Sequence, residues 1–182
     1  GQLEIQNVVG EIDLLIGSFS KTFASNGGFV ASHHEALSHY LRFYSPANTF
    51  SNSLSPVQVA VVAEALRIVS GPDGAERRRR LLRNVSTLRD ALMEEGATVL
   101  GQPSPLIPVL LGREEFARRA ARHVGMEGVL TNLVEFPAVK KNQARLRLQV
   151  MADHTPDDCE ESAVRIVRAL AYAREEMRQG ES

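Results

Sequence analysis

Residues 16–31 read IGSFSKTFASNGGFVA and place a single lysine between two apolar runs. Ser18 and Ser20 precede Lys21 at the end of the first run, and two adjacent glycines open the second. Where a strand ends in a tight turn, backbone N–H groups and hydroxyl groups can converge on a phosphate. The stretch therefore predicts a phosphate-binding turn that carries a reactive amine beside the end of a sheet.

A lysine amine in such a setting can bond covalently to an aldehyde, and pyridoxal phosphate supplies both an aldehyde and a phosphate. Gly27 and Gly28 would let the backbone pass close to such a cofactor or to a partner chain. The segment lacks the G-x-x-x-x-G-K-[ST] spacing of a nucleotide-binding P-loop. Taken by itself, the pattern Ser-x-Ser-Lys is also typical of a serine-rich loop with an exposed lysine, so this alternative stays open.

Around the lysine, the spacing of apolar residues predicts alternating strands and helices, and thus an α/β fold. The first part of the chain is predicted to hold strands at 12–16 and 29–31, a helix at 35–44, a polar loop at 45–56 and a helix from Pro56 to Gly71. The second part is predicted to hold helices at 75–95, 114–124 and from Pro156 to about Met177, and strands at 97–100, 106–111, 129–134 and 144–151. Thr155 and Asp158 resemble a capping box at the start of the last helix.

The composition gives no support for a nucleic-acid or membrane partner. The 21 Lys and Arg residues nearly balance the 22 Asp and Glu residues, and the basic run at 77–80 is typical of a solvated helix face. No apolar stretch approaches the roughly 20 residues that a membrane span needs, and no signal-peptide pattern is visible. Cys159 is the single cysteine, so no internal disulfide can form, which favours a reducing, cytoplasmic compartment.

Three segments resemble the α-oxoamine synthases, a branch of the fold-type I pyridoxal-phosphate enzymes. DLLIGSFSKTFASNGGFVAS at 13–32 resembles their lysine segment, and its SFSKTFAS portion is similar to that of serine palmitoyltransferase. FSNSLSP at 50–56 resembles a loop of 2-amino-3-ketobutyrate CoA ligase, and QARLRLQVMADHTPDD at 143–158 resembles the C-terminal signature of the family. The three segments occur in the family's order and together span nearly the whole chain.

The resemblance implies roles for residues of the first segment. Lys21 matches the lysine that bonds covalently to the cofactor and moves protons at the α-carbon of the substrate. Ser18 and Ser20 match the hydroxyl residues that hold the cofactor phosphate. Position 18 is more often threonine in the family, but serine keeps the hydroxyl donor.

The other two segments imply a neighbouring subunit and a substrate contact. Ser51 and Ser53 lie in the loop that, in relatives, reaches the phosphate of the neighbouring subunit, which implies a homodimer. Arg147 aligns with the arginine that holds the substrate carboxylate, and a bidentate Arg–carboxylate pair explains why arginine stands there. Arg145 shares the same face by strand alternation, so the choice of Arg147 rests on the alignment.

The family also has residues that this sequence does not show. In relatives, an aspartate for the ring nitrogen of the cofactor, in an Asp-x-x-His segment, and a histidine that stacks on the ring lie upstream of the lysine. Neither stands before Lys21. We therefore expect the C-terminal part of a fold-type I transferase: residues 1–74 as the end of the large cofactor-binding sheet domain, 75–96 as a connecting helix and 97–182 as a small α+β domain. By itself, such a chain is expected to bind the cofactor weakly and to leave apolar surface uncovered.

For the intact enzyme, the resemblance implies condensation of an amino acid with an acyl-CoA or acyl-carrier thioester, with loss of CO2, to an α-amino ketone. A serine palmitoyltransferase-like reaction is the leading interpretation. Two alternatives remain: an aminotransferase or lyase of the same fold, and a catalytically inactive truncated subunit. The pair His33 and His34 predicts no metal site, because no further ligand stands at a suitable spacing. Cys159 is interpreted as an ordinary helix residue.

Overall fold

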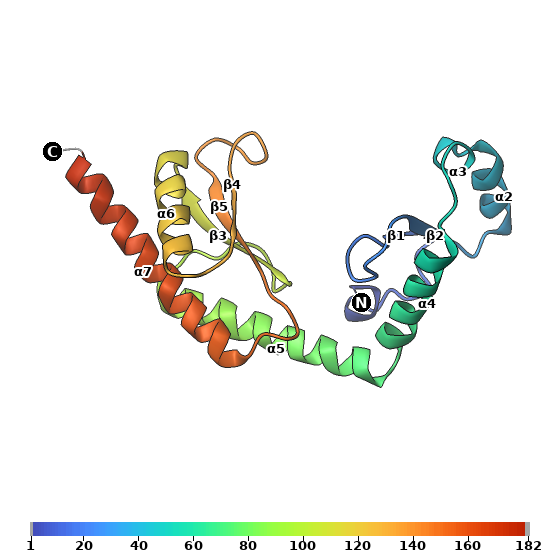
Figure 1. Cartoon of the computed structure of the whole chain (residues 1–182), viewed down its shortest axis with the longest axis horizontal. Helices are drawn as coiled ribbons and strands as arrows, with labels where there is room; N and C mark the ends of the chain where they lie inside the picture. The colour runs from blue at the N-terminus through green and yellow to red at the C-terminus, as the bar shows by residue number, and fades with distance from the viewer. Residues whose placement is uncertain (1, 181–182) are drawn as a thin grey trace. The chain divides into compact units, whose positions relative to one another are not determined.

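The computed structural model describes residues 2–180 and falls into two compact units, Gly1–Gly74 and Ala75–Ser182. Figure 1 labels the strands of both units and helices α2 to α7. The first unit holds α1 (Gln2–Ile5), β1 (Leu15–Ser18), β2 (Gly28–Ala31), α2 (Glu35–Tyr44), α3 (Pro46–Thr49) and α4 (Pro56–Ser70). The second holds most of α5 (Pro72–Glu94), then β3 (Leu106–Gly112), α6 (Glu114–Met126), β4 (Asn132–Val134), β5 (Ala144–Gln149) and α7 (Pro156–Gly180).

The first unit is built on an antiparallel hairpin of β1 and β2. Helix α4 starts at a complete capping box, because Ser55 accepts a hydrogen bond from the Gln58 backbone N–H at 3.3 Å while the Gln58 side chain accepts one from Ser55 N–H at 2.9 Å. Among the described residues of this unit, no hydrophobic side chain is buried, since every buried hydrophobic residue lies between 85 and 173. The apolar residues of the first unit are therefore half-buried or exposed, and Val57 and Val59 on α4 are among the exposed ones.

The second unit has the hydrophobic core. Its antiparallel sheet has the strand order β3-β5-β4, and β5 alternates buried and more exposed residues. Helices α5, α6 and α7 bury their apolar sides against one face of this sheet, and the core side chains include Val85, Leu88, Leu92, Ile107, Val109, Ala120, Val124, Leu146, Leu148, Ile166 and Leu170. This arrangement leaves Arg145 and Arg147 on the other face of the sheet, as period-two alternation requires.

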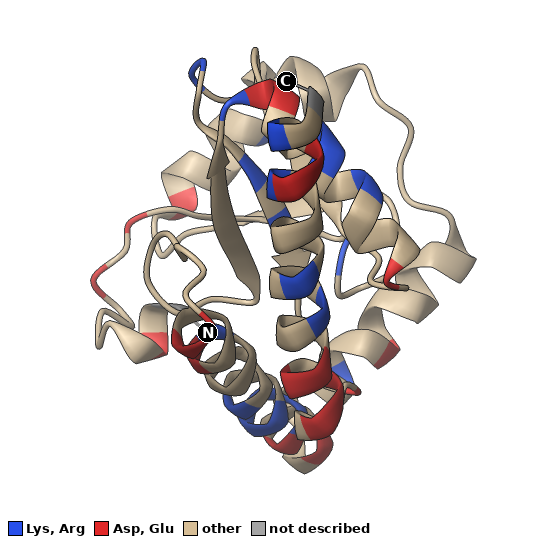
Figure 2. Ribbon diagram, turned by 90° about the vertical axis from the view of Figure 1, so that its left-hand side faces the viewer, with Lys and Arg blue, Asp and Glu red and all other residues tan. Residues whose placement is uncertain are grey.

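A polar cluster joins α6 to α7 outside this core. The Glu176 carboxylate accepts hydrogen bonds from Arg119 at 3.1 Å and Arg122 at 2.6 Å, and His123 Nε2 lies 2.8 Å from it. Figure 2 shows acidic and basic segments interspersed along α7. Since acidic and basic side chains alternate there, the surface along α7 has no extended region of purely positive or purely negative charge.

Most of the predicted elements are confirmed, although β1 and β4 begin at Leu15 and Asn132, three residues later than predicted. Two further predictions are wrong. Residues 97–100 form no strand: only Val99 pairs, in an isolated bridge with Val109. Gly96 and Gly101, with φ of 84° and 70°, turn the chain at both ends of this segment and leave it too short for a ladder. Within the predicted loop 45–56, Pro46 starts the short helix α3, because proline suits a first helical position.

Candidate functional site

Lys21 lies in the loop that joins the two strands of the hairpin. Ser18 at the end of β1 is in register with Gly28 at the start of β2. The loop is closed by a hydrogen bond from Phe19 N–H to Gly27 O at 3.0 Å, and Lys21 O accepts one from Ala24 N–H at 2.9 Å. The Lys21 side chain is exposed, and its amine has no hydrogen-bond or ion-pair partner among residues 2–180. The amine is thus available to a ligand.

The two serines before the lysine place their hydroxyl groups together. Ser18 Oγ and Ser20 Oγ lie 2.8 Å apart, and Ser18 Oγ also accepts a hydrogen bond from Ser20 N–H at 3.2 Å. Both side chains are exposed. Two hydroxyls this close can donate to neighbouring oxygens of a single anion, as the sequence predicted for a phosphate.

Packed aromatic rings and two glycines fix the backbone of this hairpin and its loop. The ring of Phe19 packs against Phe23 and Phe29, with centroid distances of 5.3 Å and 5.6 Å. A Cβ on Gly28 would lie 2.4 Å from Gly17 O, and a Cβ on Gly17 would lie 2.2 Å from the Phe29 ring. The strands therefore require glycine at position 28 to approach this closely, and glycine at position 17 leaves room for the Phe29 ring.

A hollow of about 740 Å³ adjoins the hairpin within the first unit. It is lined by Gly27 and Gly28, by the loop residues Ser51 and Ser53, and by Arg42 of α2. Both serines are exposed. The structure thus brings the predicted loop serines to the glycine pair, whereas Ser18, Ser20 and Lys21 do not line this hollow.

Arg147 lies in the second unit, on the sheet face opposite the helices. Its Nη2 donates a hydrogen bond to Asn132 Oδ1 at 3.5 Å, and Gln149 Nε2 donates to the same oxygen at 3.2 Å. Arg145 on the same face uses its Nε to donate to Gln143 O at 3.1 Å. The side chain of Arg147 is exposed, and no carboxylate of the described residues neutralises its guanidinium. A free guanidinium is the chemical requirement for holding a carboxylate.

The family model for aminotransferase class I and II matches residues 1–166. The chain belongs to this family. The putative 8-amino-7-oxononanoate synthase of Desulfovibrio desulfuricans is 38% identical over 161 residues, which cover 88% of this chain and 41% of that protein. The 2-amino-3-ketobutyrate coenzyme A ligase of Escherichia coli K12 is 35% identical over 158 residues, which cover 86% of this chain and 39% of that protein.

Comparison with solved structures leads to the same group of enzymes. A serine palmitoyltransferase from S. paucimobilis, solved with bound pyridoxal phosphate and myriocin, superposes with a TM-score of 0.86 at 27% identity and covers 95% of this chain and 43% of its own. The resemblance to the α-oxoamine synthases and the α/β fold of a partial fold-type I transferase are therefore confirmed. This aminotransferase-family chain spans about two fifths of the length of the curated relatives that it matches.

Three polar residues near the site were not found from the sequence. Ser25 lies in the lysine loop, and its hydroxyl is buried without a hydrogen-bond partner among the described residues. Ser38 and Arg42 line the hollow from α2, and their spacing of four residues, which places both on one helix face, is the signal that could have found them. No sequence signal distinguishes Ser25 from an ordinary loop serine.

Other candidate residues have ordinary environments. Cys159 is buried, and burial raises the pKa of its thiol, which disfavours the reactive thiolate. No group of three or more His, Cys, Asp or Glu residues in the described part of the chain could hold a metal ion. His34 lies 3.8 Å from the Asp13 carboxylate. Over residues 2–180, no helix has the length and apolarity to cross a membrane.

Proposed function

We propose that the whole protein is a pyridoxal-phosphate-dependent α-oxoamine synthase, which condenses an amino acid with an acyl-CoA or acyl-carrier thioester and releases CO2. The names of its relatives support this class, because they are a synthase, a coenzyme A ligase and a palmitoyltransferase. A serine palmitoyltransferase-like choice of substrates is the finer proposal. Its support is the SFSKTFAS portion of the lysine loop and the structural likeness to that enzyme.

The residues of the lysine loop fit pyridoxal phosphate. The free Lys21 amine suits its aldehyde, and the paired hydroxyls of Ser18 and Ser20 suit its phosphate. The buried Ser25 hydroxyl also lacks a partner among the described residues, as expected for a loop that is completed by a further group. When bound, this cofactor withdraws electrons from the substrate and so makes the α-proton acidic.

Each of the predicted site residues then has a defined task. Ser18 and Ser20 donate hydrogen bonds to the phosphate, and Lys21 accepts the proton from the α-carbon of the amino acid. Arg147 orients the amino acid by pairing with its carboxylate. Ser51 and Ser53 contact the phosphate in a partner subunit, so we propose a homodimer. The exposure of both serines next to the Gly27–Gly28 turn supports that task.

The single observation that carries this proposal is the free amine of Lys21 directly after two converging hydroxyls. The test is release of free thiol from acyl-CoA by the intact protein with a panel of amino acids. Release should depend on the amino acid and on pyridoxal phosphate, and Lys21→Ala should reduce it at least about a thousandfold, because a general base and covalent anchor are lost together. His33→Ala, which alters a residue outside the site, should retain the activity. If no amino acid and thioester together release thiol although the cofactor is bound, the proposal is wrong.

The second candidate is an aminotransferase of the same fold, and the observation that favours it is the family model itself. Amino-group transfer to a keto acid without consumption of thioester would assign this activity. A protein with neither activity would be the inactive subunit. A cytoplasmic location remains part of the proposal, supported by the single, buried cysteine.

A further inference from the structure

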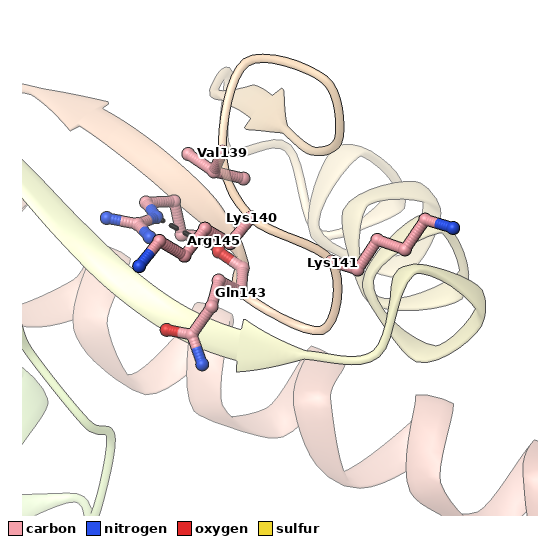
Figure 3. A pocket seen from close by; sticks show the side chains of 5 residues that line it. All are labelled: Val139, Lys140, Lys141, Gln143 and Arg145. Carbon is pink, nitrogen blue, oxygen red and sulfur yellow. Dashed lines mark hydrogen bonds between the residues drawn. The ribbon is translucent and has the colours of Figure 1, made fainter.

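A second hollow, of about 550 Å³, lies beside the turn that leads into β5. It is lined by Val139, Lys140, Lys141, Gln143 and Arg145 (Figure 3). In this view, Lys140 and Arg145 extend to the same side of the turn, whereas Lys141 extends to the opposite side. Two cationic side chains thus share one opening, and neither aligns with a residue to which the family resemblance gave a task.

The turn that carries these side chains is well anchored. Gln143 N–H donates to Lys140 O at 3.1 Å, and Asn142 N–H donates to the Glu114 carboxylate at 2.9 Å. Asn142 has a φ of 61°, a left-handed conformation that asparagine tolerates better than most residues. Arg145 is held through its Nε, which donates to Gln143 O at 3.1 Å. Its two terminal nitrogens have no partners among the described residues. Their N–H groups are therefore held in place and remain available to a ligand.

No carboxylate neutralises these two cations in the described part of the chain. Glu135 is engaged by Arg118, whose Nε donates to it at 2.9 Å. Glu114 interacts with Arg118 and Lys141, and its pKa is lowered by its bonds to backbone N–H groups. Lys141 also lies over the Phe136 ring, with its Nζ 5.4 Å from the centroid. Local negative charge is therefore on the Lys141 side of the turn, and Lys140 and Arg145 are left with an excess of positive charge.

We propose that Lys140, Gln143 and Arg145 form a binding site for a phosphate-class anion, separate from the Lys21 loop and from Arg147. A guanidinium and an ammonium on one side of the turn, with an amide donor that lines the same hollow, match the several acceptor oxygens of such a group. The anion comes from one of two sources: free phosphate, or the phosphorylated nucleotide end of a larger substrate. The inference uses no residue of the proposed cofactor site, so either can fail without the other.

The test is a titration with inorganic phosphate, followed by NMR of the backbone amides at residues 139–145. Wild-type protein should show saturable shifts confined to this turn. Lys140→Ala and Arg145→Gln should each weaken the affinity about tenfold, the loss expected for one charge-assisted hydrogen bond. Lys141→Ala is the matched control and should leave the affinity nearly unchanged, because its amine extends to the side of the turn opposite Lys140 and Arg145 and lies over the Phe136 ring. Arg145→Lys keeps the charge and should lose less than Arg145→Gln.

A parallel titration with 3′,5′-ADP distinguishes the sources of the anion. Tighter binding than inorganic phosphate, lost in Lys140→Ala, identifies a nucleotide end, and equal binding identifies free phosphate. The site does not exist if wild-type protein shows no saturable shift. It is equally refuted if sodium chloride at matched ionic strength gives the same shifts, or if Lys141→Ala weakens binding as much as Lys140→Ala.

Discussion

Gly28 determines how closely the two strands that carry the lysine loop approach each other. Any side chain at this position would collide with Gly17 O, which is backbone and cannot move aside without separating the strands. We predict that Gly28→Ala accelerates amide hydrogen exchange at residues 15–18 and 28–31, measured by NMR. Ala24→Gly in the same loop is the control: Ala24 has a φ of 49°, a conformation that glycine adopts more easily, so pairing should be retained. Equal exchange in both variants would contradict the account.

Glu176 should stabilise the contact between α6 and α7 in a pH-dependent way. Its pKa is lowered from 4.5 to about 2, first by the hydrogen bond with His123 and then by Arg122. Because the folded pKa is the lower one, the stabilisation is present above about pH 4.5 and is lost as the pH falls toward 2.

This gives a prediction for urea unfolding. Glu176→Gln should lower the unfolding midpoint clearly at pH 7, and the difference from wild type should shrink as the pH falls below 4.5. Glu175→Gln is the matched control, because that side chain makes no hydrogen bond or ion pair with the residues that the structure describes. A midpoint difference for Glu176→Gln that stays constant down to pH 2.5 would show that the carboxylate charge is not the cause.

At the scale of elements, the start of α7 shows what a local sequence signal can specify. Thr155 and Asp158 form the predicted reciprocal cap: Asp158 N–H donates to Thr155 Oγ1 at 3.1 Å, and Thr155 N–H donates to Asp158 Oδ2 at 2.9 Å. The bond from the Thr155 backbone also lowers the pKa of Asp158. Thr155→Ala should reduce the free energy of unfolding by about 1 kcal/mol in thermal or urea denaturation. Thr155→Ser keeps the hydroxyl and should lose much less, and an equal loss in both variants would contradict the capping role.

Local signals predicted other elements equally well. The apolar spacing and the flanking residues predicted α2 at its observed bounds, Glu35–Tyr44, and the start of α4 at Pro56. The segment 97–100 was mispredicted because its apolar residues suit a strand. Its pairing depends instead on the two turns that enclose it, and apolar spacing does not reveal these turns. Helix α3 was missed because its polar residues carry no helical periodicity.

At the scale of the whole molecule, the two units differ in what is buried. The second has a hydrophobic core, whereas the first buries no hydrophobic side chain among its described residues. Since burial of apolar area is the main source of stability, the slowest exchange should lie in the second unit, and the paired hairpin of the first unit should be protected less strongly. Hydrogen-exchange mass spectrometry should show strong protection in β3, β5, α6 and α7 and weak protection in α4. Comparable protection in α4 would mean that its exposed valines are covered in solution.

Separation along the sequence decides which parts of the site could be predicted. Lys21, Ser18 and Ser20 are close in sequence, so a local motif identifies them together. The approach of Ser51 and Ser53 to Gly27 and Gly28 depends on how the chain folds back, and the sequence did not predict it. The resemblance implied only that the serine loop reaches the phosphate of a neighbouring subunit. Ser38, Arg42 and the Lys140–Arg145 hollow depend on side-chain direction, which apolar periodicity does not encode.

The covalent bond between Lys21 and pyridoxal phosphate is the central claim. The direct measurement is borohydride reduction of the intact protein after incubation with pyridoxal phosphate, followed by peptide mass analysis. The account predicts one pyridoxyl group, on Lys21, and none in Lys21→Ala. A pyridoxyl group on another lysine, or on none, would contradict it.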